Sequence, residues 1–153
     1  FVFLEVPAGA RASSLGGAYA ALGEGAEASF WNPTGLAAVE RFQITGTHDE
    51  SFQNLRQDQF AFAGRWLGGG ISLSLRAFYS DPIVERDEVG NEIGTFGGQD
   101  LAFGLGYGRA LSGGFRVGAT ARVIRETIAE LSASTWAIGA GASWQSPDHP
   151  GAA

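Results

Sequence analysis

From residue 41 onward, large apolar side chains and small or polar ones alternate with a period of two. The clearest stretch is 101–108, where Leu, Phe, Leu and Tyr occupy the odd positions and Ala or Gly the even ones. Successive side chains of a strand point to opposite sides of a sheet, so this pattern predicts a strand with one apolar and one nearly bare face. The same alternation predicts five further strands, at about 41–48, 57–66, 71–79, 115–123 and 136–144.

The connections between these predicted strands differ in length. We expect long loops at about 49–56 and 81–98, tight turns at 67–69 and 111–114, and an intermediate connection at 126–131. Tight turns would then gather at one end of the sheet and long loops at the other. Outer-membrane β-barrels have this asymmetry, with short periplasmic turns and longer outward loops.

The face opposite the large apolar side chains carries mainly Gly, Ala, Ser, Thr and Arg. Such small residues leave room inside a curved sheet. Arg76, Arg116 and Arg122 fall on this face and would line the lumen of a barrel. They could attract an anionic group or pair with Glu residues of the N-terminal region. Pairing is favoured because an unpaired buried charge is costly.

Aromatic residues on the apolar face predict two girdles. Trp136 and Trp144 share a face eight residues apart, which is roughly 26 Å along a strand. With a tilt of about 40° the vertical span is near 20 Å, close to the roughly 25 Å apolar band of a membrane barrel. The full predicted girdle is Trp66, Tyr79, Tyr107, Trp136 and Trp144. Alternatively, these residues form the ordinary core of a soluble sandwich, because alternation alone does not distinguish the two.

Residues 1–40 follow a different pattern and have few large side chains with which to build a core. Asn32 as N-cap, followed by Pro33 at the first helical position, predicts a short helix, with Gly35 in the same turn. Such a segment needs another part of the molecule to pack against.

Composition narrows the function classes. The chain has 153 residues and a formal net charge of −6, which argues against nucleic-acid binding. It has no Cys, which excludes a disulfide scaffold and a Cys nucleophile. It has no Met and begins at Phe1, so we expect a processed or excised chain, for which a removed signal peptide would account. No apolar run approaches the roughly 18 residues of a membrane-spanning helix.

Candidate chemical groups are few. His48-Asp49-Glu50 could hold a metal or supply a base, but its place at a strand end favours a solvated loop, and the other histidine is His149. Acidic residues in 81–98 make Ca²⁺ binding conceivable, although EF-hand spacing is absent and a solvated hairpin tip is favoured. We therefore predict no catalytic residue, no cofactor and no metal site.

Three N-terminal stretches together resemble a known family. They are Pro7-Ala8-Gly9-Ala10-Arg11-Ala12, Leu15-Gly16-Gly17-Ala18-Tyr19 and Phe30-Trp31-Asn32-Pro33-Thr34-Gly35-Leu36-Ala37. They resemble the PorV/PorQ family, within the FadL-like group of outer-membrane barrels. This resemblance implies a barrel of around fourteen strands, within the range of such proteins, with the N-terminal segment against or inside the lumen. It also implies a secretion or envelope-assembly role, or passage of hydrophobic solutes.

The resulting hypothesis is an all-β, antiparallel transmembrane β-barrel in the outer membrane of a Gram-negative-type bacterium. Residues 1–40 would be a lumen-associated segment and 41–153 the N-terminal part of the barrel. Six strands cannot close such a barrel, so a longer protein or another chain must complete it. Expected partners are outer-membrane lipid and envelope or secretion proteins. The alternative is a soluble β-sandwich binding module using the 81–98 loop, with a hydrolase third.

Overall fold

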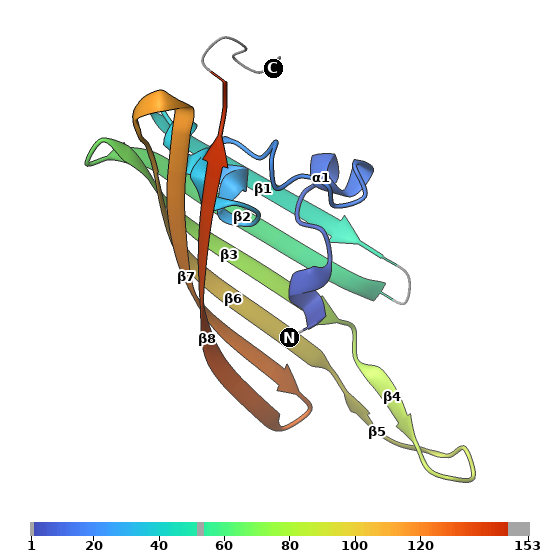
Figure 1. The fold of residues 1–153 in the computed structure, drawn as a ribbon. Coiled ribbons are helices and arrows are strands. Elements are labelled where there is room, and N and C mark those ends of the chain that lie inside the picture. Colours follow the sequence, from blue (N-terminus) through green and yellow to red (C-terminus); the bar gives the residue numbers. More distant parts are fainter. Residues whose placement is uncertain (1, 52–53, 147–153) are drawn as a thin grey trace.

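The computed structural model describes residues 2–51 and 54–146, and its main feature is one antiparallel sheet (Figure 1). Six strands pair in the order β1-β2-β3-β6-β7-β8, each antiparallel to its neighbours. Their bounds are β1 (Phe42–Glu50), β2 (Leu55–Trp66), β3 (Gly69–Ser80), β6 (Gly98–Ala110), β7 (Phe115–Ile128) and β8 (Leu131–Trp144). The expectation of an antiparallel all-β chain is confirmed. The described residues form an open sheet rather than a closed barrel, with β1 and β8 at its edges.

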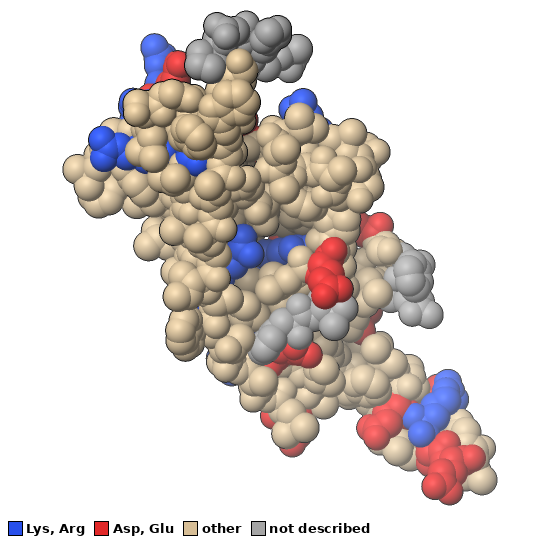
Figure 2. Space-filling model, viewed as in Figure 1, with Lys and Arg blue, Asp and Glu red and all other residues tan. Residues whose placement is uncertain are grey.

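The predicted long loop at 81–98 contains structure of its own. Strands β4 (Ile83–Arg86) and β5 (Glu92–Phe96) form a separate two-stranded sheet that projects away from the main one (Figure 1). Charged side chains gather on this hairpin, whereas most of the remaining visible surface is uncharged (Figure 2).

Two predicted connections are wrong in length. Only 51–54 separate β1 from β2, and residues 52–53 lie outside the described part of the chain. Only 129–130 separate β7 from β8. The predicted segregation of tight turns to one end is therefore wrong. Strands β1 and β2 continue beyond their apolar residues because polar side chains pair between them: Arg56 Nε of β2 donates to Glu50 Oε1 of β1 over 3.3 Å.

The N-terminal segment, defined here as residues 2–40, lies along the concave face of the curved sheet (Figure 1). It contains η1 (Val2–Glu5), α1 (Ala10–Ser14), η2 (Gly25–Ser29) and η3 (Pro33–Ala38), and one more helical turn, η5 (Ser112–Gly114), connects β6 to β7. None of the helices in the described ranges has the length and apolarity to cross a membrane. We call the face of the sheet that the N-terminal segment covers the inner face, and the opposite one the outer face.

The core lies between the N-terminal segment and the inner face, not between two sheets. Leu36 and Val39 of the segment are fully buried against Ala61 and Ala63 of β2. A second cluster joins Phe3 of η1 to inner-face residues of β6 and β7. The small side chains of the inner face thus provide the packing partner that residues 1–40 lack by themselves.

Candidate functional site

A row of four glycines crosses the inner face of the sheet. Gly70 pairs with Gly108, Gly108 with Gly118, and Gly118 with Gly141, so one bare line runs over β3, β6, β7 and β8. A Cβ atom at Gly70 would lie 2.0 Å from the carbonyl oxygen of Leu36. A Cβ at Gly108 would lie 2.2 Å from the carbonyl oxygen of Pro33. Helix η3 can therefore lie flat on the sheet only because these side chains are absent.

The predicted turn residues begin η3. Asn32 caps the helix, because its Oδ1 accepts from Thr34 N over 3.2 Å, and its Nδ2 donates to Ala20 O over 3.1 Å. Pro33 is the first helical residue, and η3 is a 3₁₀ helix. Gly35 is required by close packing within the segment, since a Cβ there would lie 1.9 Å from Gly23 O.

The N-terminal segment is also held together by its own aromatic residues. The rings of Tyr19 and Trp31 meet edge to face with centroids 5.9 Å apart, and Trp31 Nε1 donates to Ala8 O over 2.9 Å. Tyr19 OH donates to Glu27 Oε2 over 2.9 Å. Burial, together with this hydrogen bond, raises the pKa of Tyr19. The segment thus docks as a folded unit.

Two of the three predicted inner-face arginines bind backbone carbonyls of the segment. Arg76 is buried; its Nη1 donates to Leu4 O over 3.1 Å and its Nη2 to Val6 O. Arg122 Nη2 donates to Ser29 O over 2.9 Å and to Phe30 O. Each arginine therefore ties one part of the segment to the sheet through neutral acceptors.

Only the third predicted arginine pairs with a glutamate of the segment. Arg116 Nη1 lies 2.7 Å from Glu24 Oε1, and its Nη2 donates to Gln145 Oε1 over 2.9 Å. Within the described ranges, neither Arg76 nor Arg122 forms an ion pair with a carboxylate. Pairing with N-terminal glutamates thus holds for Arg116 and is wrong for the other two, whose partners are main-chain oxygens.

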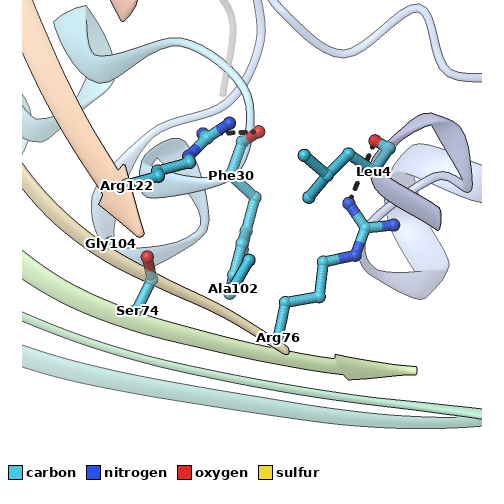
Figure 3. Close-up of a pocket in the computed structure, with 7 residues that line it drawn as sticks. All are labelled: Leu4, Phe30, Ser74, Arg76, Ala102, Gly104 and Arg122. Atoms are coloured by element: carbon cyan, nitrogen blue, oxygen red, sulfur yellow. Dashed lines mark hydrogen bonds between the residues drawn. The ribbon is translucent and has the colours of Figure 1, made fainter. Parts of the chain in front are cut away.

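A small cavity lies between the segment and the sheet, beside these two arginines (Figure 3). Its volume is about 10 Å³, close to the space that one water molecule needs. Arg76 and Arg122 approach it from two different strands, and apolar side chains of the segment cover it (Figure 3). Its lining residues are Leu4, Phe30, Ser74, Arg76, Ala102, Gly104 and Arg122.

The outer face carries three consecutive cross-strand rows without a charged side chain. In register, they are Phe42-Gly64-Ile71-Tyr107-Ala119-Ala140, Ile44-Phe62-Leu73-Leu105-Ala121-Ile138 and Gly46-Phe60-Leu75-Phe103-Val123-Trp136. We call these the outer rows. No described residue covers their large side chains: Ile138 is 72% exposed, Phe103 58% and Leu105 50%. A typical monomer exposes no contiguous apolar patch of this extent without a binding role.

Polar residues begin immediately beyond the outer rows. On the side of the β4–β5 hairpin, the next row contains His48, Asp58 and Arg125. On the opposite side, Arg109 pairs with Val117. The apolar face thus has a polar border on the hairpin side, whereas on the opposite side the exposed apolar side chains of Phe115 and Trp144 follow beyond Arg109.

The predicted aromatic residues lie at several heights on this band. Tyr107 OH donates to Leu67 O of the β2–β3 turn over 3.1 Å. Trp144 Nε1 donates to Gly113 O of the β6–β7 turn over 3.0 Å. Trp66, the last residue of β2, lies at this same end of the sheet. At the other end, Trp136 lies in the last outer row, whereas Tyr79 is two rows further out. Tyr79 OH donates to Asp58 Oδ2 over 2.8 Å.

The remaining candidate groups are accounted for by local contacts. His48 Nδ1 lies 2.6 Å from Asp58 Oδ1, both side chains being exposed. In the hairpin, Asp87 accepts from Asn91 and Val89, and Arg86 pairs with Glu92 over 2.6 Å. His149 lies outside the described residues. Among the described ones, no cluster of His, Cys, Asp and Glu has the arrangement of a metal site.

Sequence reasoning missed the glycine row, although it recognised that this face carries mainly Gly, Ala, Ser, Thr and Arg. Gly70, Gly108, Gly118 and Gly141 come from four strands, and only the strand register brings them into one line. The positions of the four glycines relative to the turns reveal the row, but only once the strand pairing is known.

The fold and site define a class of protein: an antiparallel β-sheet with an uncovered apolar outer face and a folded N-terminal segment docked on its inner face. The chain belongs to UPF0164, an uncharacterised protein family whose model matches residues 1–126. It is similar to the UPF0164 protein of Treponema pallidum (strain Nichols), with 28% identity over 144 residues, covering 78% of this chain and 33% of that protein. The chain thus spans about a third of this curated relative. No solved structure matches it.

The resemblance to the PorV/PorQ family is therefore wrong. The family that matches is UPF0164, and neither comparison points to PorV/PorQ or to FadL-like barrels. The motif that suggested the resemblance, around Trp31-Asn32-Pro33, forms a capped turn that lies against the row of glycines on the inner face. This packing requirement explains the residues without any relationship to that family.

Proposed function

We propose that the chain forms part of the wall of a β-barrel in an outer membrane, with its outer rows facing lipid and its N-terminal segment on the lumen side. The observation that carries this proposal is the set of uncharged, uncovered outer rows. In water, these exposed side chains lose the stabilising free energy of burial, about 25 cal/mol per Å² of apolar surface. In a membrane, acyl chains contact them and recover this free energy.

The height of the band supports the same proposal. Trp136 and Trp144 lie eight residues apart on one face of β8. At about 3.3 Å per residue and a tilt of about 40°, they span roughly 20 Å of height, near the roughly 25 Å apolar band of membrane barrels. The polar row with His48 and Asp58 would then lie at the headgroup level, with the β4–β5 hairpin outside the membrane.

The open edges of the sheet require additional strands in this setting. An unpaired N–H or C=O group in lipid costs several kcal/mol, and β1 and β8 each have one free edge among the described residues. We propose that other parts of a longer protein, or another chain, pair with these edges. A soluble sandwich would instead need a second sheet over the outer rows.

We propose a non-enzymatic role for this barrel, in the passage of hydrophobic solutes or in envelope assembly. The docked N-terminal segment supports controlled rather than open passage, because it fills the space over the inner face. Its ties, at Leu4, Ser29 and Phe30 among others, are hydrogen bonds to main-chain oxygens. Passage along this wall would require the segment to move.

Single-cysteine labelling tests which solvent contacts the outer rows. The chain has no Cys, so Leu105→Cys in an outer row and Val89→Cys in the hairpin can be compared in the full-length protein, reconstituted in liposomes and without other cysteines. We expect Val89→Cys to react with a membrane-impermeant maleimide. We expect a fluorophore on Leu105→Cys to be quenched by brominated phosphatidylcholine. Equal labelling of both by the water-soluble reagent would refute lipid contact.

Solute uptake tests the proposed passage. Liposomes that contain the full-length protein should take up a hydrophobic solute faster than empty liposomes. Deleting residues 2–40 should increase that rate if the segment blocks the lumen. Uptake equal to that of empty liposomes, with and without the segment, would contradict a passage role and leave envelope assembly as the proposal.

A further inference from the structure

One charged side chain lies within the apolar surface at the turn end of the outer face, where the β2–β3 and β6–β7 turns lie (Figure 1). In the strand register, the row of Arg109 lies between the outer row that contains Tyr107 and the row of Phe115 and Trp144. Aromatic side chains therefore precede and follow Arg109 on this face, and Phe115 and Trp144 are exposed. A cation in this position is surrounded by apolar surface.

The guanidinium of Arg109 has no partner among the described residues, with which it forms neither a hydrogen bond nor an ion pair. No carboxylate of the described strand residues shares the outer face at this end. At the hairpin end, by contrast, Asp58 already has His48 and Tyr79 as partners. A guanidinium has five N–H donors and no acceptor, so beside acyl chains these donors need an acceptor, preferably an anionic one.

The side chain of Arg109 reaches toward the end of the sheet. Gly68 lies in the β2–β3 turn, and a Cβ placed there would be 3.9 Å from Nη2 and 4.0 Å from both Cζ and Nε of Arg109. These nearly equal distances mean that the flat face of the guanidinium lies over Gly68, so its N–H groups point to the sides. Long cationic side chains near a membrane surface extend in this way toward the headgroups.

We infer that Arg109 binds the phosphate group of an anionic phospholipid at the turn end of the outer face. This inference rests on the proposed membrane setting of the outer rows. The phosphate oxygens accept hydrogen bonds from the free N–H groups and neutralise their charge. The acyl chains of the same lipid cover the aromatic side chains beside Arg109, which a soluble anion would leave uncovered. An anionic headgroup also carries no ammonium group to repel the guanidinium.

Quenching by brominated lipids tests the inference in the full-length protein, without other cysteines and reconstituted in phosphatidylcholine liposomes. Leu67 is 69% exposed in the turn beside Arg109, so a fluorophore on Leu67→Cys reports the lipid there. Brominated phosphatidylglycerol should associate with this position about fivefold more strongly than brominated phosphatidylcholine at the same mole fraction. Equal association would overturn the inference. Loss of the preference in inorganic phosphate, at constant ionic strength, would contradict a lipid as the source of the phosphate.

Matched variants locate the headgroup. Arg109→Gln should abolish the fivefold preference at Leu67→Cys, and Arg109→Lys, which keeps the charge, should retain most of it. Arg125→Gln removes the same charge at the hairpin end, in the row with Asp58, and should leave the preference unchanged. A preference that persists in Arg109→Gln, or that disappears in Arg125→Gln, would contradict the assignment.

The same labels separate this inference from the proposed membrane wall. If the wall is wrong, neither brominated lipid should quench a fluorophore on Leu105→Cys in the middle outer row. If both lipids quench Leu105→Cys but Leu67→Cys shows no preference for phosphatidylglycerol, the wall stands and the headgroup site at Arg109 is wrong.

Discussion

Gly118 of β7 lies directly against Pro33 of the N-terminal segment: a Cβ added at Gly118 would be 2.6 Å from the carbonyl carbon of Pro33 and 2.8 Å from Thr34 N. Both near atoms belong to the main chain, so no side-chain rotation can relieve the overlap. The backbone of η3 must move away from the sheet if position 118 gains a side chain.

Gly118→Ala should therefore weaken the docking of the N-terminal segment. Overpacking of this kind costs about 1–3 kcal/mol, and denaturant unfolding of the full-length protein with proteolytic release of the segment would measure it. Gly97→Ala is the matched control, because nothing lies within 4 Å of the Cβ it would add. Equal stability of the two variants would show that η3 does not rest on this strand.

The Asn32 cap should contribute through two separable hydrogen bonds. Asn32→Ala removes both the acceptor for Thr34 N and the donor to Ala20 O, and loss of an N-cap costs about 0.5–2 kcal/mol. Asn32→Asp keeps the acceptor and removes the donor. Asn32→Asp should therefore be the more stable variant in the same unfolding measurement, and the reverse order would contradict the capping role, because both variants lack the bond to Ala20.

The ion pair between Arg116 and Glu24 should be weak and sensitive to salt. The side chain of Glu24 is 56% exposed and that of Arg116 26%. For such pairs, a coupling free energy of about 0.2–1 kcal/mol is expected. A double-mutant cycle with Arg116→Gln and Glu24→Gln, at low and high salt, would measure it. A coupling that persists unchanged in high salt would indicate a site shielded from water.

The fold could be predicted from the sequence only where the information is local. The alternation in 101–108 directly reports which side chains share a face, and the structure confirms a strand there, β6. Strand ends were less predictable: Glu50 and Arg56 look like loop residues, yet they pair across β1 and β2. The change from apolar to polar side chains predicts where the apolar surface of a strand ends. The strand itself ends where its backbone no longer pairs with the neighbouring strand.

The site depended on non-local information. The hydrogen bonds from Arg76 to Leu4 O and Val6 O could not be predicted from charge patterns. Every residue has a backbone carbonyl, so the sequence does not single out the acceptors. Reasoning from charge led to glutamate partners, which is right only for Arg116. The glycine row likewise needed the register of four strands.

The turn of the β4–β5 hairpin should loosen in acid. Hydrogen bonds from the side chain and backbone of Asn91, and from Val89 N, hold the pKa of Asp87 below the ordinary value of an aspartate side chain, 3.8. A carboxylate with a lowered folded-state pKa stabilises the turn above its unfolded pKa. That contribution is lost as the pH falls through the lowered value. The amide shifts of Val89 and Asn91 should titrate below pH 3.8, and Asp87→Asn should abolish the transition. A midpoint at or above the ordinary value would contradict these bonds.

A charge placed on the outer face should distinguish lipid from water as the solvent there. Leu105 lies in the middle outer row of β6, and Gln99 lies on the same face of that strand, in the row with Tyr79. In a membrane barrel, Leu105→Arg should cost about 2–4 kcal/mol and Gln99→Arg about 0–1 kcal/mol. Urea unfolding of the full-length protein from liposomes measures the difference. On a water-exposed face both substitutions would stay within about 0.5 kcal/mol of the wild type, so equal small effects would refute the membrane wall.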